Sequence, residues 1–181
     1  GRVSRRPAGV RARLGRRCLA AARCRPVRAR VPRGDADGDG YVEFSTRSSR
    51  GIRHQGWKDS DESIGGVVGP RPRPPIALVE VQGYYYAALT GVAEALRRYG
   101  SGVEEQAKGG LAEKLEKQAA RLKAQFNQDY WSEATGFYVH ALDGSKAQVP
   151  DVTSNVGHCL WTGIVDEARA GGYRGHGGGV R

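Results

Sequence analysis

The sequence has no long hydrophobic run and only three cysteines among its 181 residues. No stretch approaches the ~18 consecutive apolar residues of a membrane-spanning helix, so no membrane partner is expected. The longest apolar run near the start, residues 18–22, is shorter than the apolar core of about 7–15 residues in a secretory signal. Three cysteines imply no disulfide framework, which favours a reducing, cytoplasmic compartment.

Acidic residues are absent from the first 33 positions, which contain 12 arginines. The formal net charge of +10 arises there, because the remaining chain has 17 basic and 19 acidic residues. Three interpretations stay open: a basic targeting segment, an arm that binds nucleic acid, and an out-of-frame translation of GC-rich DNA. The segment has no aromatic residue to stack on bases, which weighs against nucleic acid. We expect residues 1–33 to be a disordered or out-of-frame arm and the Gly-rich residues 169–181 a disordered tail.

Hydrophobic periodicity predicts two long helices. Apolar residues recur at spacings of three and four over residues 76–99, and residues 103–128 carry an apolar face that includes Leu111, Leu115 and Phe126. Only a few residues separate the two segments, so we expect an antiparallel helical hairpin.

The residues after this hairpin predict a short β segment and a third helix. Turn-forming pairs flank a strand-like stretch, residues 137–142. Residues 153–155, Thr-Ser-Asn, are suitable N-cap residues for a helix over 156–168, in which Cys159 is expected to pack as a small apolar side chain. The order of elements therefore predicts a mainly α domain over residues 34–168.

An acidic segment, Asp35-x-Asp37-x-Asp39-Gly40, matches the first positions of an EF-hand calcium loop. The twelfth position is Thr46 rather than the bidentate Glu, and no helix is predicted before Asp35, so a true EF-hand is not expected. Two alternatives stay open: a turn whose carboxylates accept hydrogen bonds from nearby backbone amides, and a weaker calcium site of another kind. No other cofactor is expected.

Residues 55–60, Gln-Gly-Trp-Lys-Asp-Ser, combine groups that suit a sugar ligand. Trp57 offers a flat apolar face, and the neighbouring glycine permits close approach of the backbone. Burial against Trp57 would raise the pKa of Asp59, whereas Lys58 would lower it, and a general acid requires the first effect to dominate. An ordinary surface turn is the alternative.

Four segments in this order, 34–43, 55–60, 75–84 and 153–163, resemble the bacterial amylo-α-1,6-glucosidases, which are similar to glycogen debranching enzymes. The resemblance covers about residues 34–168. It implies the (α/α)6 barrel of the six-hairpin glycosidases and hydrolysis of α-glucosidic linkages in oligo- or polysaccharides. The expected partner is then an oligosaccharide or an α-glucan.

The resemblance also implies roles for individual residues. Asp59 corresponds to the general acid of an inverting reaction, which requires a second carboxylate ~6.5–9.5 Å away. The alternative interpretation of Glu80 is an ordinary charge at a helix start. The alternative interpretation of His158 is a buried, hydrogen-bonded core residue. The expected substrate-binding residues are Gln55, Trp57, Lys58, Glu80, Gln82, Asn155 and His158.

The sequence departs from the family pattern beyond residue 168. The catalytic base of the family is a Glu downstream of the Thr-Ser-Asn-x-Gly-His motif, and residues 169–181 contain no acidic side chain. Only two or three of the six helical hairpins are present. We therefore expect a partial (α/α)6 barrel without turnover. A non-catalytic carbohydrate-binding remnant and a nucleic-acid binder remain the alternative functions.

Overall fold

The computed structural model describes residues 34–46, 48–52, 54–57, 64–65, 71–99 and 103–170, with the side chains of 103–109 excepted. The chain divides into two units between Arg33 and Gly34, and the described residues all belong to the second. The expectations for residues 1–33, Lys58, Asp59 and 171–181 lie outside the described residues.

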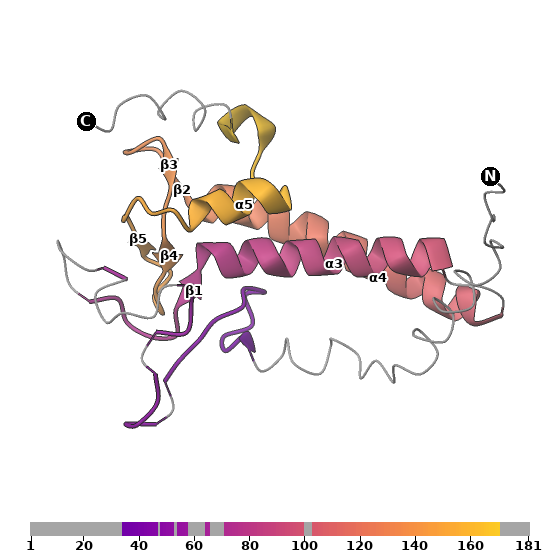
Figure 1. Ribbon diagram of the computed structural model, residues 1–181, viewed down its shortest axis with the longest axis horizontal. Helices are drawn as coiled ribbons and strands as arrows, with labels where there is room; N and C mark the ends of the chain where they lie inside the picture. Colours follow the sequence, from indigo (N-terminus) through magenta and orange to yellow (C-terminus); the bar gives the residue numbers. More distant parts are fainter. Residues whose placement is uncertain are drawn as a thin grey trace, which may run out of the picture. The chain divides into compact units, whose positions relative to one another are not determined.

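Two long helices form the predicted hairpin. Helix α3 spans Val79–Tyr99 and helix α4 spans Val103–Asp129, and they lie side by side along most of their length (Figure 1). Nε and Nη2 of Arg97, in the last turn of α3, each donate to a carboxylate oxygen of Glu116 in α4 at 2.5 Å. The hairpin is confirmed, and the buried residues of its interface include Leu89, Ala93, Ala119, Leu122 and Phe126.

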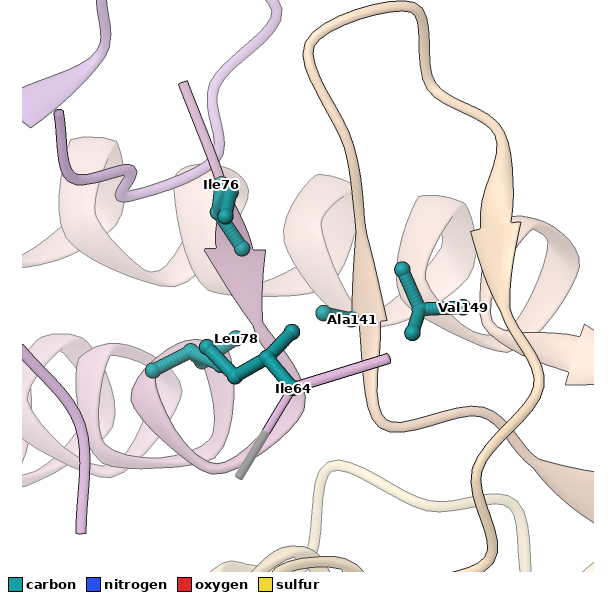
Figure 2. Close-up of a cluster of buried hydrophobic side chains, with 5 residues drawn as sticks. All are labelled: Ile64, Ile76, Leu78, Ala141 and Val149. Carbon is teal, nitrogen blue, oxygen red and sulfur yellow. The ribbon is translucent and has the colours of Figure 1, made fainter. Parts of the chain in front are cut away.

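A small antiparallel sheet packs at the start of α3. Strands β1 (Ala77–Leu78), β4 (Ala141–Leu142) and β5 (Gln148–Val149) lie in the order β1-β4-β5. Figure 2 shows the apolar cluster on this sheet, to which Ile64 and Ile76 contribute. The helix predicted to begin at residue 76 therefore begins at Val79, because long-range strand pairing takes the residues before it.

The predicted strand over residues 137–142 is two strands instead. Strand β3 (Phe137–Tyr138) pairs with β2 (Trp131–Ser132), whereas β4 pairs with β1 and β5. Between them, the amide of Val139 donates to the carbonyl of Tyr130 and the amide of His140 donates to Val149. The chain changes partners within six residues, and sequence periodicity does not contain that information.

An aromatic cluster joins the end of α4 to these strands. The rings of Phe126 and Tyr130 stack with centroids 4.7 Å apart, and Phe126 stacks on Tyr138 at 5.4 Å. The hydroxyl of Tyr130 donates to the carbonyl of Ala77 at 3.0 Å, and Tyr41 meets Tyr130 edge to face. These rings fix the segment around Tyr41, the start of β1 and the end of α4 to one another.

Helix α5 (Val156–Thr162) lies along the first half of α3 (Figure 1). It ends at Gly163, which has a left-handed φ of 76°, so the helix predicted over 156–168 is shorter than expected. The buried thiol of Cys159 donates to the carbonyl of Val79 at 3.2 Å, which confirms its packing role. Gly83 permits the close approach, since a Cβ there would lie 2.9 Å from Thr162 Oγ1.

The described residues are thus partly helical with small sheets, and they extend to residue 170, two residues into the expected tail. Among the described helices, none combines the length and hydropathy that a bilayer-spanning helix needs.

Candidate functional site

Three segments that are far apart in the sequence meet at the second residue of α3. Glu80 is only 1% exposed, and its Oε1 accepts two hydrogen bonds. One comes from the backbone amide of Trp57 at 3.3 Å and the other from Nδ2 of Asn155 at 2.8 Å. Three of the residues predicted to bind substrate therefore converge at one carboxylate.

Asn155 occupies the N-cap of α5 without capping it. An N-cap asparagine usually accepts a hydrogen bond from an amide of the first helical turn, but this side chain makes no cap bond. It turns instead into the protein, where it is 1% exposed and bonded to Glu80.

Several buried oxygens at this site have no hydrogen-bond partner among the described residues. They are Oε2 of Glu80, Oδ1 of Asn155 and Oγ1 of Thr153, and each exposes less than 1 Å². An unsatisfied buried polar atom costs about 1–3 kcal/mol, so a native structure that retains such atoms together calls for an explanation.

Aromatic rings lie beside these polar groups. The ring centroids of Trp57 and His158 are 5.2 Å apart, and Nδ1 of His158 lies 2.8 Å from the hydroxyl of Tyr84. Trp57 is 67% exposed and Tyr84 38% exposed. His158 is half-buried at the surface rather than a core residue. Burial raises the pKa of Tyr84, and the negative charge of Glu80 raises it further.

Tyr84 is a site residue that the sequence interpretation missed. It follows Glu80 by four residues in α3, which places both side chains on the same helix face. The spacing of four residues from Glu80 is the sequence feature that could have identified Tyr84.

Gly56 allows the Trp57 segment to approach α3. A Cβ at this position would lie 2.3 Å from Cδ1 of Leu78 and 3.1 Å from Oε1 of Glu80. The first distance is too short for any real contact, so an added Cβ would require the buried Leu78 side chain to move.

Gln82, expected to share a cleft with Glu80, bonds in another direction. Its Nε2 donates to the carbonyls of Val42 and Leu78 at 2.8 and 3.0 Å, and its Oε1 accepts from the amide of Val42 at 2.9 Å. Residues two apart in a helix point to different sides, which explains the divergence. Gln82 holds the segment around Val42 onto α3, and Gln55 is exposed to solvent.

The acidic segment forms a second cluster. One carboxylate oxygen from each of Asp35, Asp37 and Asp39 lies within 4.8 Å of the others, so the group could hold a metal ion. Asp35 also accepts hydrogen bonds from the amides of Gly38 and Gly40 at 2.7 and 3.1 Å, as the turn interpretation predicts.

A lysine ammonium already lies against this cluster. Nζ of Lys146 is 2.8 Å from Asp37 and 2.6 Å from Asp39, and it also bonds to the fully buried carboxylate of Glu43. Burial opposes the charge of Lys146, but the hydrogen bonds that it donates to these three carboxylates dominate and raise its pKa. A metal ion would compete with this internal cation.

Comparison with the models of known protein families gives no match, and no curated protein matches the sequence. The interpretation of the site therefore depends on its residues and their geometry.

Proposed function

We propose that residues 34–168 are part of a glycoside hydrolase of the amylo-α-1,6-glucosidase type and bind an α-glucoside at Glu80. The observation that carries the proposal is the convergence of Trp57, Glu80, Asn155 and His158 from three separate segments. The resemblance implies a substrate-binding role for the same four residues.

The chemistry of the site suits a sugar. The exposed indole of Trp57 offers a face for the apolar side of a pyranose ring, and Glu80 and Asn155 supply buried polar atoms beside it. In this proposal the hairpin of α3 and α4, with α5 against it, is a part of an (α/α)6 barrel.

Asp59 is the proposed general acid. It follows Trp57 by two residues in the sequence, and the backbone amide of Trp57 donates to Glu80. The resemblance places the base beyond the matched residues, and an inverting reaction needs both carboxylates. We therefore expect these 181 residues to bind without releasing glucose.

Calorimetric titration of the full chain with isomaltotriose and maltotriose tests the proposal. We expect binding that Trp57→Ala weakens and that Trp161→Ala, which removes another exposed tryptophan, leaves unchanged. Absence of binding to both sugars, or equal effects of the two variants, would refute it. Glucose release that Asp59→Asn abolishes would refute the expected lack of turnover.

A further inference from the structure

The two unpartnered oxygens of Glu80 and Asn155 belong to side chains that bond to each other. Asn155 Nδ2 donates to Glu80 Oε1 at 2.8 Å. The unpartnered Oδ1 shares its carbon with that Nδ2, and the unpartnered Oε2 shares its carbon with that Oε1. One hydrogen bond therefore links the two side chains that carry the free acceptors.

When Glu80 is ionised, both atoms can accept hydrogen bonds but cannot donate them. The described residues place no lysine or arginine in an ion pair with Glu80, and no donor reaches Asn155 Oδ1. A ligand that satisfies both acceptors must bring two hydrogen-bond donors, one for each. Hydroxyl groups on adjacent ring carbons supply two such donors, and their ring would extend toward the exposed face of Trp57.

We propose that Glu80 and Asn155 form a paired acceptor that selects a vicinal diol of the sugar ring. This inference rests on the proposed carbohydrate site and adds its specificity. Each acceptor receives a hydrogen bond from one hydroxyl, so removal of either hydroxyl leaves a buried acceptor unsatisfied. Charged acceptors make the stronger of such bonds, so Glu80 Oε2 contributes more than Asn155 Oδ1.

The ligand enters on the side of Trp57. Both acceptors expose less than 1 Å², so a neighbouring group must move before a ligand reaches them. The backbone bond from Trp57 to Glu80, at 3.3 Å, is longer than the usual range of about 2.7–3.2 Å, and the Trp57 side chain is mostly exposed. The side chain of Trp57 therefore forms the exposed side of the site.

Glu80→Gln isolates the acceptor. The variant keeps an oxygen for the bonds from Trp57 and Asn155 but replaces Oε2 with an NH2 group, which can donate to Asn155 Oδ1. We expect the unfolding temperature of the variant to equal or exceed that of the native chain. We also expect its affinity for isomaltotriose to fall by about tenfold to hundredfold. Glu94→Gln, the same change at an exposed position of α3, is the matched control and should change neither quantity.

Deoxy sugars provide the second measurement. A series of isomaltose analogues each lacks one hydroxyl of the non-reducing ring. Two of them, deoxygenated at adjacent carbons, should bind the native chain at least tenfold more weakly than isomaltose does. At least one of these losses should disappear in Glu80→Gln, because the interaction is already missing there.

The outcomes separate this inference from the proposed function. If isomaltotriose does not bind the native chain, the proposed function fails. If it binds but Glu80→Gln unfolds at a lower temperature and binds with native affinity, Glu80 is structural and the diol inference alone is overturned. Tighter binding of glucosamine than of glucose, lost in Glu80→Gln, would identify a cation site and would also overturn it.

Discussion

Asn155 donates its side-chain amide to Glu80 across 75 positions of sequence, at 2.8 Å, from the N-cap of a helix that it does not cap. This bond joins the start of α5 to the start of α3. It also positions the one carboxylate that bonds to the Trp57 segment. The four predictions below test this bond, the glycine beside it and the lysine of the acidic cluster.

Asn155→Ala should lower the free energy of unfolding by about 1–3 kcal/mol, because it removes a buried bond to a charged group. Urea denaturation measures the change. Ser154→Ala, at the exposed neighbouring position, is the control and should stay within about 0.5 kcal/mol of the native chain. Equal stability of the two variants would show that the Asn155–Glu80 bond contributes nothing to folding.

Gly56→Ala should displace the Trp57 segment, since the added Cβ would lie 2.3 Å from Leu78. We expect about 1–3 kcal/mol of destabilisation and loss of sugar binding. Gly91→Ala is the matched control, because a Cβ there meets nothing within 4 Å in the interior of α3. It should stabilise the protein by about 0.5–1 kcal/mol. Native binding by Gly56→Ala would contradict the placement of this segment.

Lys146→Met should destabilise the domain, because three carboxylates would then face one another without a cation. Glu43 is buried whereas Lys146 is partly exposed, so we expect a loss of about 1–3 kcal/mol, less than for a fully buried pair. Lys117→Met breaks an exposed pair with Glu113 and should change the free energy of unfolding by less than Lys146→Met does. A smaller effect at Lys146 than at Lys117 would contradict the cluster's role.

The Lys146 cluster also predicts a pH window. The hydrogen bond from Lys146 lowers the pKa of Asp37 from its ordinary 3.8, so this stabilisation is present above that value and is lost as the pH falls through the folded-state pKa. The pKa of Lys146 is raised from 10.5, so its contribution is complete below that value and is lost at higher pH. The difference in unfolding temperature between the native chain and Lys146→Met should be constant near neutral pH and shrink toward both extremes. A difference independent of pH in thermal scans would refute the ionic explanation.

Much of the domain's helical structure was readable from residue patterns. The spacing of apolar residues predicts both helices of the hairpin, and a buried Cys159 follows from its apolar neighbours. The residue patterns predict the first residue of a helix and the pairing of strands less accurately. Residues 76–78 and 137–142 take their structure from pairing with distant strands, and local propensity cannot report on such pairing.

The candidate site divides in the same way. The sequence alone determined which residue types were available: an indole beside a glycine, a carboxylate at a helix start and an amide at an N-cap. Only the tertiary structure decided that Glu80 and Asn155 meet, that Tyr84 joins them and that Gln82 turns away to Val42. The physical reason is that helical periodicity fixes which face a residue occupies, whereas the packing of distant segments fixes what that face contacts. The same holds for Lys146, whose charge is plain in the sequence and whose three carboxylate partners lie more than 100 positions away.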